Sequence, residues 1–327
     1  MLIAGSRVAS GQSQSADLPP PGRLIDIGGY RLHLYCSGTS VPGQPTVVLS
    51  AGSGDYATDW WIVQTAVADS TRVCSYDRAG FGWSDLGPQP HTLRQETYEL
   101  DLLLKRGGER GPFVLVGHSL GGQVVRLFQE EHRTVVVGMV LVAPTHENTR
   151  LVVRGQLVQL RTLAQDRTVP PVHSLAEAPP TAATGEEAAA CQLTAAPDAK
   201  IVRPYDQLPA QPRQYRIWLL AHPKCGMSDG EDYLPEELAD VAARRTAGPQ
   251  PLGAIPLIVV VPGRLSTPRG VSPEAWRREY ADNMADLSRL SRNGRVVADS
   301  VSGHHVQLDN PRVVVAAIWD VLRDLRR

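Results

Sequence analysis

Residues Phe113–Gly122 read FVLVGHSLGG, and this run decides the fold. Apolar residues typical of a β-strand lead into GHSLG, a G-x-S-x-G pattern, and a helical pattern begins directly after it. In this context the motif is a sharp strand–turn–helix connection with the serine at its tip. We therefore expect Ser119 to present its hydroxyl to a substrate. Gly117 and Gly121 would leave room for a strained backbone and for close packing of strand on helix. The alternative is a plain βα turn in which Ser119 only caps the helix.

Strands and helices alternate on both sides of this elbow. The predicted strands are Leu24–Gly28, Tyr30–Cys36, Thr46–Ala51, Arg72–Tyr76, Phe113–His118, Val136–Val142, Pro256–Val261 and Arg295–Asp299. The predicted helices are Trp60–Asp69, His91–Arg106, Ser119–Glu131, Pro273–Ser291 and Pro311–Arg326. This alternation predicts an α/β fold, with a mostly parallel sheet of about eight strands flanked by helices.

The alternation stops between residues 148 and 250, where no strand pattern is apparent. Helical stretches are predicted there at Thr149–Ala164, Pro212–His222 and Pro235–Ala247. We predict that residues 148–250 form a helical cap inserted after the sixth strand, over the sheet edge where α/β proteins bind ligands. The alternative is an insertion that only adds stability. The core would then comprise residues 22–147 and 251–327, and residues 1–21 would form a flexible tail or the remnant of an export segment.

Composition restricts the partners. The chain has 327 residues, a net charge of −1, 42% apolar residues and 20% charged residues, which is typical of a soluble globular protein. No basic field favours nucleic acid, and no apolar run reaches the roughly 20 residues that span a bilayer. No C-x-x-C motif or His/Cys cluster at zinc spacing occurs, so we expect neither a metal nor a cofactor, and a small-molecule substrate. The oligomeric state stays open, as does the compartment, cytoplasmic or exported.

Four cysteines do not make a disulfide scaffold in a chain of this length. Cys36 and Cys74 lie in apolar strand-like runs, so we expect them to be buried as small hydrophobic side chains. Cys191 and Cys225 lie in the insertion and can pair if the protein is exported.

A serine nucleophile needs a base to take its proton. His304 follows the last predicted strand and precedes the last helix, so its loop reaches the same sheet edge as Ser119. We predict that His304 is the general base, although a loop histidine can also be merely solvated. Its neighbour His305 is assigned to packing or to lining the pocket.

An acyl-transfer site also needs two N–H donors for the developing oxyanion. The N–H of Leu120 follows the nucleophile and is the first. The small residues AGSGD at 51–55 follow the third predicted strand, and we assign the second donor to Ser53, with Gly52 next. A plain turn is the alternative.

The run RVCSYDRAGFGWSD at 72–85 contains Asp77 and Arg78, which we expect to pair and to support the site structurally. Several residues are candidates for the lining of the substrate pocket. Those near the core are Gly52, His118 and Trp83, and those in the cap are Trp218, Leu219, Leu220, Met227 and Tyr233.

These motifs together resemble the α/β-hydrolase superfamily, in its serine-nucleophile branch. The resemblance covers about Pro21–His146 and Leu252–Arg327 and rests on VVLSAGSG, SYDRAGFGWSD, VGHSLGG and SGHHVQLDNP. It implies Ser119 as nucleophile, His304 as base, and Ser53 and Leu120 as oxyanion donors. Epoxide hydrolases and haloalkane dehalogenases of this fold have aspartate where this chain has Ser119, so the resemblance argues against both.

The triad acid is missing from its expected places. In the branch that this chain resembles, the acid follows the sixth strand in a V-L-V-D ending, and here Ala143 follows VLV. The stretch VPGRLS at 261–266, where many relatives carry the acid, also has none. Four explanations stay open. Glu147 reaches back to His304, Asp299 substitutes, a weakened Ser–His pair works without an acid, or Ala143 is an introduced change that slows turnover.

The first functional hypothesis is a serine hydrolase that cleaves carboxylic esters through an acyl-enzyme on Ser119. An amidase, peptidase or lactonase would use the same machinery. The third hypothesis is a non-catalytic binding module that keeps the pocket of this fold without its triad.

Overall fold

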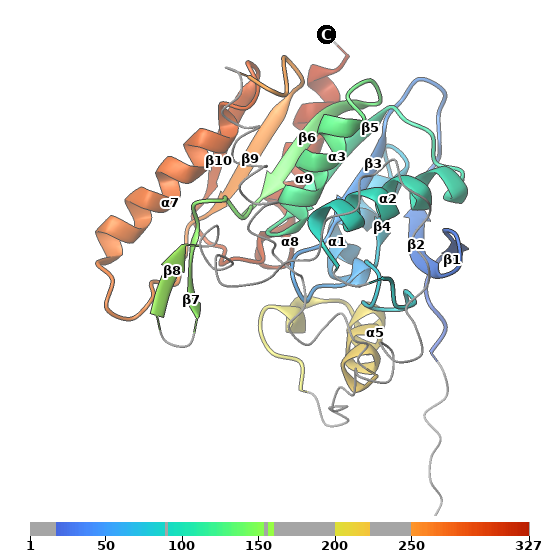
Figure 1. Ribbon diagram of the computed structural model, residues 1–327, viewed down its shortest axis with the longest axis horizontal. Helices are drawn as coiled ribbons and strands as arrows, with labels where there is room; N and C mark the ends of the chain where they lie inside the picture. Colours follow the sequence, from blue (N-terminus) through green and yellow to red (C-terminus); the bar gives the residue numbers. More distant parts are fainter. Residues whose placement is uncertain (1–17, 89–90, 154–155, 160–199, 223–249, 327) are drawn as a thin grey trace, which may run out of the picture.

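The structure is a computed structural model that describes residues 18–88, 91–153, 156–159, 200–222 and 250–326. Its centre is an eight-stranded sheet in the order β1-β2-β4-β3-β5-β6-β9-β10 (Figure 1). The strands are β1 Arg23–Asp26, β2 Arg31–Ser37, β3 Thr46–Ser50, β4 Val73–Tyr76, β5 Phe113–His118, β6 Val136–Val142, β9 Leu257–Pro262 and β10 Gly294–Asp299. All pairs from β4 to β10 are parallel, whereas β2 pairs antiparallel with both β1 and β4. The predicted fold class is confirmed.

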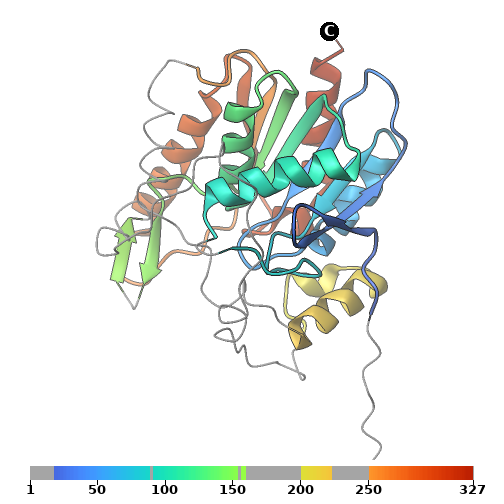
Figure 2. The ribbon, with the colours of Figure 1, turned by 45° about the vertical axis from the view of Figure 1, so that its right-hand side comes forward.

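Helices cover both faces of the sheet, as its continuous apolar strands require. The helices are α1 Trp61–Ala68, α2 Leu93–Gly107, α3 Gly121–Glu131, α7 Pro273–Ser288 and α9 Pro311–Asp324. Along β5, Val114 and Val116 face the core beneath α1 and α9, while Leu115 faces the core beneath α2, α3 and α7. Figure 2 shows α2 and α3 in front of the sheet and α9 behind it. Both cores are therefore built by side chains that alternate along the central strands.

The insertion contains a hairpin that we did not predict. Strands β7, Arg150–Val153, and β8, Gln156–Gln159, pair antiparallel, so the helix expected at Thr149–Ala164 is wrong for the part that is described. Two short runs rich in valine and leucine, separated by Arg-Gly, are a hairpin signal, and β-branched residues favour the strand.

The remaining described part of the insertion is helical. Helix α5, Ala210–Ala221, confirms the predicted helix at Pro212–His222, and the 3₁₀ helix η3, Tyr205–Gln207, precedes it. Both elements contact the end of the sheet where η1, Ala57–Trp60, and α8, Val306–Asp309, lie (Figure 1). The helix predicted at Pro235–Ala247, Met227 and Tyr233 lie outside the described residues.

The prediction that Cys36 and Cys74 are separate buried hydrophobes is wrong. They form a disulfide across the antiparallel pair β2–β4, where they are direct partners in the register. The antiparallel pairing of β2 with β4 places these two cysteines, 38 positions apart in sequence, directly opposite each other. Cys191 and Cys225 lie outside the described residues.

The chain contacts the core from Leu18 onward, because the Trp83 indole donates a 3.0 Å hydrogen bond to the Leu18 carbonyl. Within the described ranges, no helix is long and apolar enough to cross a membrane.

Candidate active site

Ser119 lies at the tip of a strained turn between β5 and α3. Its φ is +50°, in the left-handed region that non-glycine residues rarely adopt. The turn is fixed to the next strand, because Ser119 N–H donates to the Val142 carbonyl at 3.1 Å and Thr145 N–H donates to the Ser119 carbonyl at 3.0 Å. The Ser119 hydroxyl lies 3.3 Å from the hydroxyl of Thr145.

The two glycines of the motif allow this close approach. A Cβ at Gly117 would lie 2.4 Å from the Gly121 carbonyl oxygen, and one at Gly121 would lie 2.5 Å from the Ser50 carbonyl oxygen. Both positions therefore require glycine, which confirms the packing role predicted for them.

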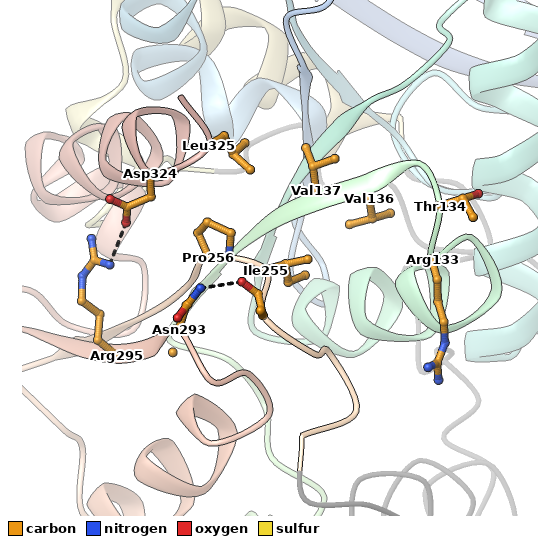
Figure 3. Close-up of a pocket in the computed structure, with 12 residues that line it drawn as sticks. Arg133, Thr134, Val136, Val137, Ile255, Pro256, Asn293, Arg295, Asp324 and Leu325 are labelled. Carbon is orange, nitrogen blue, oxygen red and sulfur yellow. Dashed lines mark hydrogen bonds and ion pairs between the residues drawn. The ribbon is translucent and has the colours of Figure 1, made fainter. Parts of the chain in front are cut away.

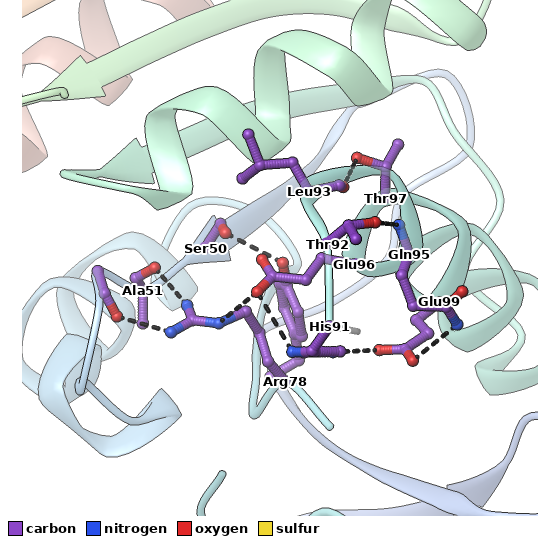
Figure 4. Close-up of polar contacts among 12 residues, drawn as sticks. Ser50, Ala51, Arg78, His91, Thr92, Leu93, Gln95, Glu96, Thr97 and Glu99 are labelled. Carbon is purple, nitrogen blue, oxygen red and sulfur yellow. Dashed lines mark hydrogen bonds and ion pairs between the residues drawn. The ribbon is translucent and has the colours of Figure 1, made fainter. Parts of the chain in front are cut away.

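Arg78 fixes the loop that follows β3. Its buried guanidinium donates to the carbonyls of Ala51 and Gly52, at 2.7 and 2.9 Å (Figure 4). In a planar trans peptide the C=O and the following N–H point in opposite directions. Holding the Gly52 carbonyl therefore turns the Ser53 N–H away from Arg78. Within the described residues, neither this N–H nor that of Leu120 donates a hydrogen bond, so both are available to an oxyanion.

A buried polar network supports Arg78 from α2 (Figure 4). Its guanidinium lies 3.4 Å from Glu96, and His91 lies 3.6 Å from Glu96 and 3.1 Å from Glu99. The Tyr30 hydroxyl donates to Glu99 at 2.5 Å. We predicted that Arg78 pairs with Asp77, but these contacts give Arg78 other partners.

Asp77 supports a different part of the loop. It accepts from the backbone N–H of Ala57 at 2.7 Å and of Trp83 at 3.2 Å, and it pairs with buried His33 at 2.7 Å. A Cβ at Gly82 would collide with this carboxylate, so glycine is required there too. The run at 72–85 thus supports the site structurally, as expected. The partners of Asp77 and Arg78, however, could not be predicted from the sequence spacing.

His304 lies beside the residue that precedes the nucleophile. Its carbonyl oxygen is 3.1 Å from Nε2 of His118, and the two rings are 4.8 Å apart. Among the described residues, no hydrogen bond joins the His304 ring to Ser119 or to a carboxylate. Catalytic hydrogen bonds are often long before substrate binds, so this separation leaves the assignment of the base in place.

The electrostatics keep His304 neutral. It remains accessible to solvent on one side, yet the surrounding protein and the nearby rings of His118 and His305 lower its pKa from 6.5 to about 3. The neighbouring His305 behaves in the opposite way. Burial lowers its pKa, but the hydrogen bond and charge of Asp55 outweigh burial and raise it above 6.5. His304 is therefore the ring whose neutral form its surroundings favour.

Asp55 is the carboxylate at the centre of this histidine group. It is buried, and it lies 3.2 Å from Nδ1 of His118 and 3.4 Å from Nε2 of His305. The Tyr205 hydroxyl donates to it at 2.7 Å and lies 2.8 Å from Nε2 of His305. Burial opposes the charge of Asp55, but its bonds to His118 and His305 hold its pKa well below 3.8.

The candidate acids have other partners in the structure. Glu147 is buried and pairs with Arg126 at 2.6 Å. Asp299 accepts from the Ser302 hydroxyl and, at 3.1 Å, from the Asn310 amide. Ala143 directly follows β6 and has a φ of +41°, a left-handed conformation that aspartate and asparagine adopt more readily than alanine.

The aromatic residues proposed for the pocket pack against each other. The rings of Trp83 and Trp218 are stacked 6.0 Å apart, and Trp83 is buried. Leu219 is buried in the same aromatic cluster and Leu220 is half-buried on α5. Gly52 lies directly against the His118 ring, since a Cβ there would be 2.6 Å from Nδ1.

A large hollow lies at the opposite end of the sheet. It has a volume of about 860 Å³ and is lined by the starts of β6 and β10 and by the C-terminal helix (Figure 3). Arg295 and Asp324 form an ion pair of 3.1 Å at its rim. It therefore does not belong to the site around Ser119, which lies at the carboxyl ends of the strands.

Comparison with known proteins agrees with this architecture. The profile of the Alpha/beta hydrolase family matches residues 47–317, most of the chain. The chain belongs to the alpha/beta hydrolase family. This membership supports hydrolysis as its reaction class.

Individual relatives are more distant. An AB hydrolase superfamily protein of Gibberella zeae is 32% identical over 114 residues, which are 34% of this chain and 35% of that protein. The chain spans between 19% and 39% of the length of the first eight curated relatives that it matches.

Solved structures share the fold across nearly the whole chain. A thermophilic esterase from Thermogutta terrifontis has a TM-score of 0.58 and 19% identity, over 91% of this chain and 95% of that one. An enol-lactonase from Burkholderia xenovorans has a TM-score of 0.58 and 17% identity, over 92% of this chain and 100% of that one. At these identities the likeness establishes the fold of this alpha/beta hydrolase, not its substrate.

Three residues of the site were missed in the sequence. Asp55, Thr145 and Tyr205 come from different segments and have no motif that joins them. Asp55 lay within the quoted AGSGD run, but its partners His118 and His305 are 63 and 250 positions away. Only the fold brings these residues together.

The buried histidine of the network predicts a pH-dependent stability. Burial lowers the pKa of His91, but Glu99 and Glu96 outweigh burial and raise it to about 9. Because the pKa of His91 is higher in the folded than in the unfolded chain, where it is 6.5, protonated His91 stabilises the fold. This stabilisation is fully present below pH 6.5 and disappears as the pH rises through 9. We expect the free energy of unfolding in urea to fall by on the order of 3 kcal/mol from pH 6 to pH 9.5. His91→Gln should lose most of this dependence; the same slope in both proteins would contradict the assignment.

Proposed function

We propose that this chain is a serine-dependent hydrolase of carboxylic esters. The observation that carries the proposal is Ser119 in a left-handed conformation at the β5–α3 elbow, together with the N–H groups of Ser53 and Leu120, which donate no hydrogen bond within the described residues. Such strain at a non-glycine residue persists where the surrounding structure enforces it, which is typical of a nucleophile.

In the proposed reaction, Ser119 Oγ attacks the ester carbonyl while His304 takes its proton. The N–H groups of Ser53 and Leu120 stabilise the oxyanion, and the alcohol leaves with the proton from His304. Water then attacks the acyl-enzyme by the same route, which frees the acid and regenerates Ser119. The low pKa of His304 keeps its ring neutral in the free enzyme well below pH 6.5, but it also makes the ring a weak base.

A weak point of this machinery is the imidazolium form of His304. A triad acid would hold its tautomer and stabilise its charge. In this chain, Ala143 occupies the position where the serine-nucleophile branch of the family carries that acid. We therefore propose that the enzyme hydrolyses its substrate slowly. Amidase, peptidase and lactonase activities use the same groups, so a panel of esters, anilides and lactones decides the bond that is cleaved.

The first test removes the nucleophile. Ser119→Ala should reduce hydrolysis of p-nitrophenyl acetate and butyrate to the uncatalysed background, because no hydroxyl remains to form the acyl-enzyme. Ser40→Ala, the same exchange in an exposed loop, is the matched control and should keep the wild-type rate. Retention of activity in Ser119→Ala would overturn the mechanism.

The second test restores the acid. Ala143→Asp should raise kcat/KM at least tenfold, since the loss of a triad acid costs about 10⁴-fold in well-studied enzymes. The new carboxylate should also raise the pKa of His304 and shift the acidic limb of the pH–rate profile upward. Ala143→Asn, of equal size and without charge, should show neither effect. An equal gain in both variants would indicate relief of backbone strain at φ +41° instead.

The third test loosens the oxyanion loop. Arg78→Lys keeps the positive charge, but one ammonium group cannot serve the carbonyls of Ala51 and Gly52 together with Glu96. We expect kcat to fall at least tenfold, with the melting temperature also lowered. Arg133→Lys, at an exposed position, is the control. A wild-type kcat in Arg78→Lys would show that the loop keeps its geometry without the two hydrogen bonds from the arginine side chain.

Among the described residues no carboxylate bonds to the His304 ring, which favours a second candidate, a binding module that keeps the pocket and has lost turnover. A fluorophosphonate separates the two. An activated Ser119 should be labelled covalently in wild type and not in Ser119→Ala. A wild-type protein that binds esters and resists labelling would support the binding module.

A further inference from the structure

Three residues beside the proposed catalytic pair bring their ligand atoms together. Asp55 lies on the loop after β3, His118 ends β5, and His305 precedes α8. One oxygen of Asp55 is 3.2 Å from Nδ1 of His118, and the other is 3.4 Å from Nε2 of His305. One ligand atom from each residue lies within 4.8 Å of the others. Tetrahedral bonds of about 2.0–2.2 Å place neighbouring ligand atoms roughly 3.3–3.5 Å apart, so only small movements would close the set around one ion.

His118 places one ring nitrogen against a backbone carbonyl and the other against the Asp55 carboxylate. Its Nε2 lies 3.1 Å from the His304 carbonyl, which can only accept, so Nε2 carries a proton. Its Nδ1 is the ring atom that faces the Asp55 carboxylate, at 3.2 Å. A metal ion bound there would replace the proton of this hydrogen bond. Metal-binding histidines characteristically donate their second ring N–H to a carbonyl or carboxylate, as His118 does here.

We propose that Asp55, His118 and His305 bind one divalent transition-metal ion, with zinc as the best fit to two imidazoles and a carboxylate. The Tyr205 hydroxyl supports the site from the insertion, since its 2.7 Å bond to Asp55 holds the carboxylate in place. Gly52 borders the site, because a Cβ there would lie 2.6 Å from Nδ1 of His118 and 3.0 Å from the Asp55 oxygen.

The site flanks both proposed catalytic residues. His118 precedes Ser119 in the chain and holds the His304 carbonyl, and His305 follows His304. The binding of a metal ion here does not rest on the proposed function.

The binding test uses Co²⁺ and Zn²⁺ on the full chain after treatment with a chelator. We expect one Co²⁺ per chain, with visible d–d absorption in the protein, and displacement of this absorption by Zn²⁺. Asp55→Asn and His305→Gln should each weaken binding at least 100-fold, because each removes one of three ligands. His132→Gln, a histidine at the end of α3 outside the cluster, is the matched control and should bind as wild type does.

Circular dichroism on each variant identifies any that fail to fold. His305→Gln is less prone to disturb folding than Asp55→Asn, because His305 is half-exposed whereas Asp55 is buried. Absence of saturable 1:1 binding to wild type would overturn the proposal, as would wild-type affinity in folded His305→Gln. Fluorophosphonate labelling of the metal-free chain reports the proposed function separately. Labelling without metal binding would refute only the metal site, and metal binding without labelling would refute only the hydrolase mechanism.

Discussion

The site depends on one buried cation held in a fixed place. Arg78 donates to two consecutive carbonyls of the loop after β3, and Glu96 on α2 balances its charge. A loop of glycine and serine has no side chains that could define its own path, so the guanidinium fork supplies that definition. Because a peptide group is planar, fixing Gly52 O also fixes the direction of Ser53 N–H. The proposed oxyanion donor at Ser53 is thus oriented before any substrate arrives, as electrostatic stabilisation of a transition state requires.

Carboxylates in this chain are distributed differently from those of a complete triad. Glu147 neutralises Arg126 and Asp299 accepts hydrogen bonds from its own loop, so neither is directed at His304. Among the described residues, the carboxylate that contacts His118 and His305 is Asp55. His304 is left with neighbours that disfavour its charged form, and its pKa is lowered accordingly. In the proposed mechanism this distribution would make His304 a weak catalytic base, and it places together the three residues of the proposed metal site.

The sequence predicted those parts of the molecule that depend on local pattern. The elbow, the sheet and its flanking helices follow from glycine spacing and from runs of apolar residues, and all are present. The hairpin at 150–159 was missed because two four-residue runs also fit a helical period. The disulfide between Cys36 and Cys74 and the contacts of Asp55 depend on which strands become neighbours. Such pairings are set by tertiary structure, and no spacing along one chain reveals them.

The described part of the insertion does more than cover the sheet. Arg216 on α5 forms a buried ion pair with Asp59 of η1, and its guanidinium lies 3.4 Å above the Tyr205 ring. Tyr205 in turn holds Asp55. Because a buried charge left without its partner is costly, Asp59 and Arg216 strongly favour the position of α5 seen here. That position carries the Tyr205 hydroxyl into the histidine group. The geometry of the site is therefore coupled to the seating of the insertion, and movement of α5 would alter the electrostatics around His304 before any substrate contact was lost.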